Sequence, residues 1–315
     1  MKKLLILSAM CLAMTAQATV LRVSNVPNSG APYSTIPAAL EVAVAGDTIM
    51  VDGSSTNYLI SGGLQVTKRI VLMGPGYLLT QNGVLSNGNA SATVESAVTF
   101  SDEAAGTIIQ GMTLKSNVNI QTPNVVVTRC KIDGTVAISS GATNVVIHQN
   151  LISSRVGGTG SVNPANVQIT NNIFTRELNS TGGVVHDITE SRFAYNTFTS
   201  YASGTFVPIA SFTSCTIENN IFLHPEQTIS SCTMINNYWG ESDSPYKNLT
   251  NDLEIKNVDT TAIADAVAGK GAFAGDDPYV ISGIPAGPVI QDITVPASVE
   301  QGKTLNVTIK LGVQR

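Results

Sequence analysis

The chain has 315 residues, of which only 12% are charged and 43% are hydrophobic, and its formal net charge is −5. Globular proteins ordinarily carry about 25% charged residues. The hydrophobic content excludes an intrinsically disordered chain, and a negative charge without a basic stripe argues against nucleic acid as a partner. The polar surface must therefore come from Asn, Ser, Thr and Gly, which favours strands and turns over helices.

The first 18 residues have the features of an export signal. Lys2 and Lys3 precede an apolar segment from Leu4 to Met14, and Ala16-Gln17-Ala18 offers a small-x-small cleavage site. The apolar segment is shorter than the roughly 20 residues that span a bilayer, and we expect no membrane span further along the chain. We therefore predict cleavage after Ala18 and a secreted, periplasmic or cell-surface location.

A short helix is predicted at about residues 34–45. Ser34 is placed to cap it, Pro37 lies in its first turn, and Gly46 marks its end. One face of this helix is apolar and comprises Ile36, Ala39, Leu40 and Ala43.

A repeat of variable length fills the middle of the chain. Its eight-residue window has apolar residues at places one, three and eight, and seven clear copies start at residues 107, 125, 145, 167, 191, 215 and 232. Places one and three alternate with the period of a strand and point into a core, and place eight belongs to a second strand after a bend. We predict the bend at place six, because asparagine tolerates left-handed backbone angles. Stacked copies would build an asparagine ladder from Asn150, Asn172, Asn196, Asn220 and Asn237.

These features resemble the right-handed parallel β-helix proteins of the pectin-lyase-like superfamily, over roughly residues 30–250. The resemblance implies an all-β, single-stranded solenoid whose N-terminal end is capped by the helix at 34–45. We expect about ten coils, with the β-helix at 19–258 and a C-terminal extension at 259–315. A helical patch at 261–268 and a terminal strand pair, in which residues 305–310 pair with 289–295, are predicted within that extension.

Cysteines and histidines give no metal or catalytic pattern. Cys215 and Cys232 occupy the same inward place in adjacent copies, so their Cα atoms should lie about 4.8 Å apart. That distance allows a disulfide, but parallel side chains suit its dihedral angle poorly. We expect these two residues and Cys130 to be small core residues, and no cysteine pair has metal-ligand spacing. His186-Asp187 resembles half of an acid–base pair without a third member, which favours a solvated loop pair. No metal and no cofactor is therefore assigned.

Relatives of this fold cleave acidic polysaccharides, but their motifs are missing here. The resemblance to pectate lyases implies clustered aspartates on one face that hold calcium, whereas the outward strand places hold Val, Gln, Arg, Thr, Leu, Ile and Lys. The Asn-Thr-Asp, Gly-His-Gly and Arg-Ile-Lys motifs of polygalacturonases are also missing. A hydrolase with two carboxylates would need them about 5–10 Å apart over a groove, and no catalytic residue is assigned.

The residues two and three places after the inward aromatic begin the variable-length loops, where solenoids usually display a binding surface. We predict a carbohydrate-binding ridge, for which an ordinary solvated loop edge is the alternative. The leading hypothesis is an extracytoplasmic, non-catalytic carbohydrate-binding or surface-interaction protein with polysaccharide as the candidate partner. Its alternatives are a polysaccharide lyase or glycoside hydrolase and a purely structural or adhesive rod, and the oligomeric state is left open. The ridge comprises Arg155, Arg176, Glu177, Tyr201, His224 and Glu241.

Overall fold

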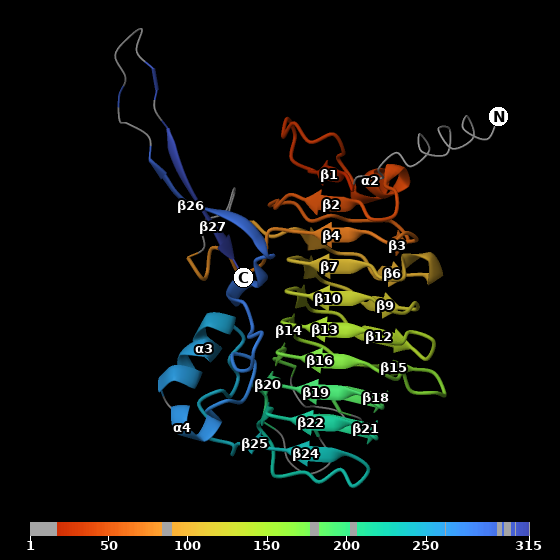
Figure 1. Ribbon diagram of the computed structural model, residues 1–315, viewed down its shortest axis with the longest axis vertical. Helices are drawn as coiled ribbons and strands as arrows, with labels where there is room; N and C mark the ends of the chain where they lie inside the picture. Colours follow the sequence, from red (N-terminus) through yellow and green to blue (C-terminus); the bar gives the residue numbers. More distant parts are fainter. Residues whose placement is uncertain are drawn as a thin grey trace, which may run out of the picture.

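In the computed structural model, three parallel sheets run along one solenoid (Figure 1). The structure describes residues 18–83, 90–176, 183–201, 207–261, 263–294, 298, 304–305 and 307–314. Sheet A contains, in spatial order, β1 (Val20–Val23), β2 (Thr48–Val51), β4 (Val71–Met73), β7 (Ile108–Gln110), β10 (Val126–Thr128), β13 (Val146–His148), β16 (Gln168–Thr170), β19 (Arg192–Ala194), β22 (Thr216–Glu218) and β24 (Thr233–Ile235).

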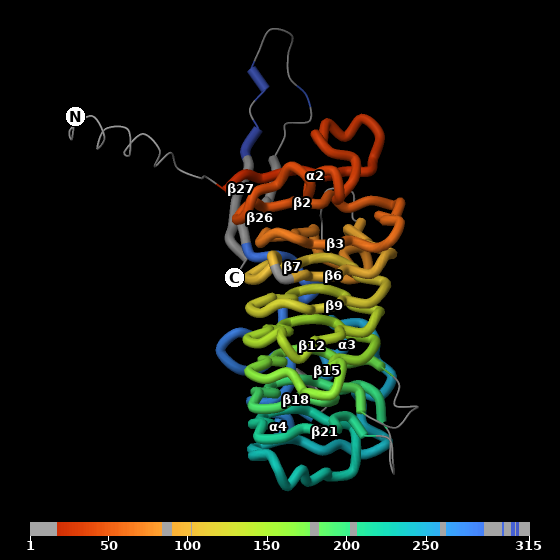
Figure 2. The backbone as a smooth tube through the Cα atoms, turned by 90° about the vertical axis from the view of Figure 1, so that its right-hand side faces the viewer, coloured from red at the N-terminus to blue at the C-terminus, as the bar shows by residue number. Residues whose placement is uncertain are grey.

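The other two sheets complete the coils. Sheet B contains β5 (Thr93–Val94), β8 (Thr113–Leu114), β11 (Lys131–Ile132), β14 (Leu151–Ile152), β17 (Ile173–Phe174), β20 (Thr197–Phe198), β23 (Ile221–Phe222) and β25 (Tyr238–Trp239). Sheet C contains β3 (Leu64–Val66), β6 (Val98–Phe100), β9 (Val118–Ile120), β12 (Val136–Ser139), β15 (Val156–Thr159), β18 (Val185–Thr189) and β21 (Ile209–Thr213). Sheet C runs along the face seen in Figure 2.

The chain visits the sheets in a fixed cycle. From β4 to β21 it passes through sheets A, B and C six times, and β22 to β25 then add A, B, A and B. Every strand of these three sheets pairs in parallel with its counterpart in the neighbouring coil; for example, Val126, Val127 and Thr128 lie beside Val146, Ile147 and His148. This arrangement confirms the all-β, single-stranded parallel β-helix that the repeat predicts.

The core is formed by the inward places of the repeat. The residues at place three of successive copies are at most 1% exposed, from Ile109 through to Ile217. The aromatic rings at place eight follow one another through the coils: Phe174 stacks on Phe198 with centroids 4.7 Å apart, Phe198 and Phe222 are tilted at 5.2 Å, and Phe222 stacks on Trp239 at 4.5 Å.

The asparagine ladder lies inside the solenoid as predicted. The backbone N–H and the side-chain Nδ2 of Asn150 both donate to Oδ1 of Asn172, each at 3.0 Å, and the same pattern continues through Asn196 and Asn220 to Asn237.

The bend itself is one residue earlier than predicted. The left-handed backbone angle falls at place five, because the place-six side chain must point inward to reach its neighbours. The place-five residues with positive φ are Gly111, Arg129, Gln149, Asn171, Tyr195, Asn219 and Asn236.

Helix α2 (Ile36–Val42) covers the N-terminal end of the core with Ile36, Ala39 and Leu40. Its cap is Thr35, not Ser34 as predicted, and the Ala38 N–H donates to Thr35 Oγ1 at 3.3 Å. The helix also ends before Gly46, because Ala43 turns to an extended conformation. The ammonium group of Lys68 then donates to the carbonyl groups of Leu40, Glu41 and Ala43, which satisfies this helix end.

The C-terminal extension covers the outer face of sheet B (Figure 1). It contains α3 (Asp252–Thr261), α4 (Ala264–Val267) and the 3₁₀ turn η2 (Ile281–Gly283); a second such turn, η1 (Asp102–Ala104), lies within the solenoid. The predicted patch at 261–268 contains α4, whereas α3 is not predicted. Beyond η2, β26 (Gly287–Thr294) pairs in antiparallel fashion with β27 (Thr308–Gln314).

A second apolar core joins this extension to the solenoid. Leu151, Ile173 and Ile221 point outward from sheet B and are at most 2% exposed, and Ile255 of α3 and Val267 of α4 pack in the same cluster. The extension therefore closes one side of the solenoid, and sheets A and C face outward elsewhere.

Candidate functional site

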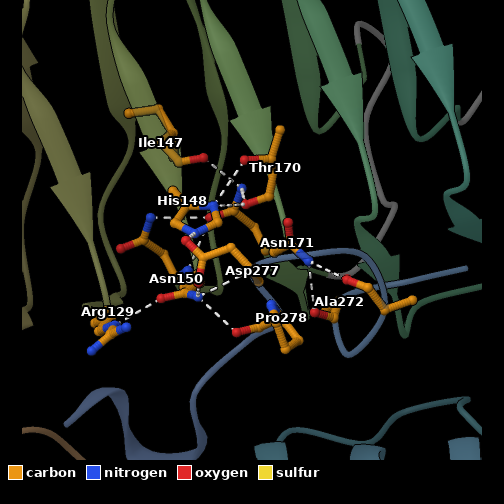
Figure 3. A network of polar contacts seen from close by, with 12 residues as sticks. Arg129, Ile147, His148, Asn150, Thr170, Asn171, Ala272, Asp277 and Pro278 are labelled. Atoms are coloured by element: carbon orange, nitrogen blue, oxygen red, sulfur yellow. Dashed lines mark hydrogen bonds and ion pairs between the residues drawn. The ribbon is translucent and has the colours of Figure 1, made fainter. Parts of the chain in front are cut away.

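One edge of sheet A holds the extension through polar contacts (Figure 3). Nε2 of His148 lies 3.0 Å from Oδ2 of Asp277, and Nε2 of Gln149 donates to Oδ1 of Asp277 at 2.9 Å and to the Pro278 carbonyl at 2.6 Å. Nε of Arg129 in turn donates to Oε1 of Gln149 at 2.7 Å. Arg129 and Gln149 are place-five residues, so the left-handed bend points their side chains toward the extension.

His148 is a structural residue in this network. Burial lowers its pKa, and the neighbouring Asp277 carboxylate opposes that shift. Its Nδ1 lies 2.8 Å from Oγ1 of Thr170 on β16, so both ring nitrogens have partners. These contacts tie the imidazole to both β16 and the extension.

The outward face of sheet A carries a polar hollow of about 610 Å³. Three side chains in register, Gln168 of β16, Arg192 of β19 and Thr216 of β22, form its floor. Because neighbouring strands are about 4.8 Å apart, the floor repeats at that spacing along the solenoid axis. No described helix or strand lies over this face in Figure 1. The hollow is lined by Asn144, Asn166, Val167, Gln168, Glu190, Ser191, Arg192, Ser214 and Thr216.

Arg192 is held in a fixed position at this floor. Its Nε and Nη2 both lie 2.7 Å from Oε1 of Glu218, and its guanidinium lies 5.7 Å from the ring centroid of Tyr195. The ion pair is partly exposed, so it contributes little stability. Its effect is to orient the guanidinium and to neutralise its charge.

The rim of the hollow is formed by residues with left-handed backbone angles. Asn144 and Asn166 have φ values of 56° and 55°, and Glu190 and Ser214 have values of 47° and 56°. Asparagine adopts this region readily, but for other residues with a Cβ it costs about 1–2 kcal/mol. Left-handed angles recur at the corners of other coils as well, for example at Asn124, Arg129 and Gln149, so they belong to the turns of the solenoid and do not single out the hollow.

The predicted ridge lies at the corner between sheets B and C, away from this hollow. Arg155 and Arg176 lie near each other: burial lowers the pKa of Arg176, and the positive charge of Arg155 lowers it further. The ring of Tyr201 lies 6.0 Å from Nζ of Lys247.

Two of the remaining ridge residues are described, and they differ in exposure. His224 is 6% exposed, with Nδ1 against the Pro225 carbonyl and its ring edge-on to Trp239. Glu241 is exposed, and Glu177 lies outside the described residues. The structure thus brings Arg155 and Arg176 together but turns His224 inward.

The hollow was missed although its signal is visible in the sequence. Place two of the repeat points outward in sheet A, and it changes along the chain from Val126 and Val146 to Gln168, Arg192 and Thr216. These residues do not form the aspartate cluster expected of a pectate lyase. The change from apolar to polar side chains at place two marks the part of the open face of sheet A that is hydrophilic.

The three cysteines that the structure describes are unpaired thiols, and they differ in burial. Cys130 and Cys215 are 0% and 2% exposed, as predicted, whereas Cys232 is only half-buried because no coil stacks beyond it. Burial, and to a smaller extent the neighbouring Cys232, raises the pKa of the Cys215 thiol to about 11. In the described part of the chain, no three or more His, Cys, Asp or Glu side chains converge as a metal site. His186 and Asp187 form a pair on β18 with Nδ1 and Oδ2 2.8 Å apart.

A family model described as NosD, periplasmic copper-binding protein, matches residues 40–252, which is more than half of the chain. The chain belongs to the NosD family. The matched residues run from α2 to the start of α3 and include the whole hollow on sheet A. No curated protein and no solved structure matches the chain.

Membership of the NosD family supports the extracytoplasmic location that the N-terminal segment predicts, because NosD is a periplasmic family. Among the described residues, no helix has both the length and the apolar character needed to cross a bilayer. Cleavage after Ala18 remains a prediction, since residues 1–17 lie outside the described part.

Proposed function

We propose that this NosD-family protein binds carbohydrate outside the cytoplasm, without catalysis, at the hollow on sheet A. The observation that carries the proposal is the floor of Gln168, Arg192 and Thr216, which stand in register on three adjacent strands. Sugar hydroxyl groups both donate and accept hydrogen bonds, and amide and hydroxyl side chains offer both functions. Because the floor belongs to a rigid sheet, little ordering is needed on binding.

The charges at the hollow favour a neutral sugar over an acidic one. The guanidinium of Arg192 is already paired with the Glu218 carboxylate, and Glu190 adds a negative charge at the rim. A sugar carboxylate would meet this negative charge without an unpaired cation among the lining residues. A neutral, hydroxyl-rich oligosaccharide has no such penalty.

The two carboxylates near the hollow do not favour a hydrolase. A glycoside hydrolase keeps one carboxyl group protonated by placing it in an apolar environment. Glu190 is exposed, and Glu218 accepts hydrogen bonds from Arg192. A purely structural rod, in turn, gives no reason for the change from Val126 and Val146 to the polar residues Gln168, Arg192 and Thr216 on the open face of sheet A.

A panel of neutral and acidic oligosaccharides tests the proposal with the chain from Thr19 onward. We expect binding of a neutral oligosaccharide in calorimetry, weakened at least about tenfold by Gln168→Ala and by Arg192→Ala. The matched controls are Arg155→Ala and Arg176→Ala at the B–C corner, which should leave the affinity unchanged.

The opposite pattern would refute the site. If the corner variants abolish binding and the hollow variants do not, the sugar binds at the originally predicted ridge. Release of reducing or unsaturated ends from any polysaccharide would contradict the non-catalytic assignment.

Copper is a second candidate ligand, because the description of the family names it. Among the described residues, no group of three or more His, Cys, Asp and Glu side chains is placed to hold a metal ion, so a copper site there would need methionine as a further ligand. Soft donors fit better: Cys232 and Met234 line one hollow of about 430 Å³ at the C-terminal end of the solenoid. Thiolate and thioether sulfur select Cu(I). Competition for Cu(I) against a chromogenic chelator tests whether the chain binds copper at all.

A further inference from the structure

A nearly buried carboxylate lies at the N-terminal end of the solenoid, where β1 and β2 begin. Parallel pairing of these strands places Thr19 beside Asp47, one residue before each strand, and the Thr19 carbonyl accepts from the Thr48 N–H at 2.9 Å. Asp47 is 3% exposed. Its Oδ1 accepts from the backbone nitrogen of Thr19 and its Oδ2 from the Val44 N–H, each at 2.8 Å. Both carboxylate oxygens are therefore held by backbone donors.

This carboxylate is ionised but has no side chain as its counter-ion. Hydrogen bonds from Val44 and from Thr19 lower the pKa of Asp47, burial opposes them, and the charge of Lys68 adds a smaller lowering. No Lys, Arg or His side chain in the described part of the chain forms an ion pair with Asp47. The Lys68 ammonium instead donates to the carbonyls at the end of α2. A charge with so little exposure ordinarily has a partner of opposite charge.

We propose that cleavage of the leader supplies this partner, because the mature N-terminus at Thr19 forms an ion pair with Asp47 that locks the first coil. A signal peptidase adds one water across the peptide bond between Ala18 and Thr19, which leaves a carboxyl group on Ala18 and an amino group on Thr19. The amino group then takes up a proton at neutral pH, since its ordinary pKa is about 7.7–8.0. The atom that becomes charged is the one already 2.8 Å from Oδ1 of Asp47.

The position of β1 explains what such a lock would achieve. This four-residue strand is the outermost strand of sheet A and pairs only with β2, so it is the strand of the sheet most prone to fraying. Toward its end, the guanidinium of Arg22 already pairs with the Asp52 carboxylate at 2.7 Å. A second ion pair at Thr19 would hold the start of the same strand. Hydrogen bonds between an ammonium and a carboxylate are about twice as strong as those between neutral groups.

The test compares two chains that differ only in their first residue, Thr19 or Ala18, each released from a fusion partner by a protease that leaves no added residue. Ala18 is exposed, so retaining it moves the amino group by one residue without disturbing the core. In the chain from Thr19 we expect an α-amino pKa at least about one unit above its ordinary value, which is tenfold tighter proton binding. The rate of labelling by an amine-reactive reagent as a function of pH measures this pKa. Amide exchange in β1 at pH 7 should also be at least about tenfold slower than in the chain from Ala18.

The advantage of the chain from Thr19 should depend on pH. An α-amino group whose pKa is raised on folding contributes stability that is complete below about pH 7.7 and is lost as the pH rises through the folded-state pKa. The difference in melting temperature between the two chains should therefore be present at pH 7 and vanish near pH 10. Lys68 and the pair of Arg22 with Asp52 are common to both chains, so their titration does not affect this difference.

Two substitutions, made in both chains, identify the partner of the amino group. Asp47→Asn removes the charge and should return the α-amino pKa to its ordinary value, so that the two chains become alike. Asp52→Asn is the matched control, because it removes the carboxylate at the other end of β1 and should leave the difference between the chains intact. Circular dichroism checks that every variant is folded.

Three results would overturn the proposal. One is an ordinary α-amino pKa in the chain from Thr19, and another is a raised pKa that survives Asp47→Asn. The third is a first residue other than Thr19, found by mass spectrometry in protein exported with its own leader. None of these results bears on the hollow on sheet A, so the lock and the proposed sugar binding fail independently.

Discussion

Asn196 shows how one side chain fixes the contact between neighbouring coils. Its Oδ1 accepts from both the backbone N–H and the Nδ2 of Asn172, and its own Nδ2 donates to Oδ1 of Asn220. All of these groups are buried, where an unsatisfied donor costs about 1–3 kcal/mol. The ladder is therefore needed to keep the interior of the bend fully hydrogen-bonded.

Asn196→Ala should lower the free energy of unfolding by about 2–4 kcal/mol, because it leaves the buried backbone N–H of Asn172 without its acceptor and removes the amide that donates to the Ile169 carbonyl and to Oδ1 of Asn220. Denaturant unfolding measures this change. The matched control is Asn57→Ala, which removes an exposed amide bonded to Glu95 at a position without a left-handed backbone angle and should cost less than about 0.5 kcal/mol. Equal losses in the two variants would show that the ladder has no special role.

His148 predicts a pH dependence of the contact with the extension. Burial lowers its folded-state pKa below the ordinary value of 6.5, so the unfolded chain binds the proton more readily. Stability from this residue is thus complete above about pH 6.5 and falls as pH drops toward the folded-state pKa. Thermal melting between pH 7.5 and pH 5.5 should show this fall.

His148→Gln should flatten that profile. Comparing the two profiles isolates His148 from Asp252, whose pKa is raised by burial and whose contribution changes with pH in the opposite sense. Parallel profiles for the two proteins would contradict the assignment.

At the scale of elements, the extension is held together by contacts within itself and approaches the solenoid closely at one glycine. The carboxylate of Asp252, at the start of α3, accepts from the Ser282 N–H at 2.7 Å and from the Tyr279 hydroxyl at 3.2 Å. Gly283 has φ 54°, and a Cβ there would lie 2.4 Å from the Arg129 carbonyl oxygen. Glycine is therefore required where η2 approaches the edge of sheet A.

Gly283→Ala should release the segment that contains η2, because both its backbone angle and its contact become unfavourable. We expect a loss of about 2–4 kcal/mol and faster amide exchange across residues 270–284. Gly269→Ala is the control: its φ of 71° is equally left-handed, but no atom lies within 4 Å of the added Cβ. If both variants behave alike, only backbone strain and not the contact matters.

The sequence predicts the solenoid well because its information is local and periodic. Places one, three and eight are set by strand alternation and by one bend, so the strands of the repeat fall where the pattern predicts them. The predicted bend differs from the observed one by one residue because asparagine occupies both place five and place six in Asn171-Asn172 and Asn219-Asn220. The residue type alone does not indicate which of the two side chains points inward.

The candidate site is harder to predict from the sequence, because its location depends on which sheet of the solenoid the C-terminal extension covers. Helix α3 has a weak apolar pattern, and its buried Ile255 is identified only by contact with sheet B. Once sheet B is covered, the binding surface shifts to the open face of sheet A. Strand register then brings Gln168, Arg192 and Thr216 together, although 24 residues separate each from the next.

The whole molecule is a capped rod with two different ends and three different sides. Helix α2 closes the N-terminal end, whereas the last coil leaves Met234 and Trp239 half-buried. Sheet B is covered by the extension, and sheet A offers the polar hollow (Figure 1). The low charge of the chain fits this arrangement, because the internal ladder and the hollow both rely on neutral polar side chains.

Hydrogen–deuterium exchange of the chain from Thr19 onward, with and without a bound oligosaccharide, tests most directly whether the open face of sheet A is the binding surface. Binding should slow exchange in the segments that line the hollow, at residues 144–146, 166–168, 190–192 and 214–216. Exchange at Arg155, Arg176 and Tyr201 on the B–C corner should stay unchanged. Protection confined to that corner, or to the covered face of sheet B, would contradict the account.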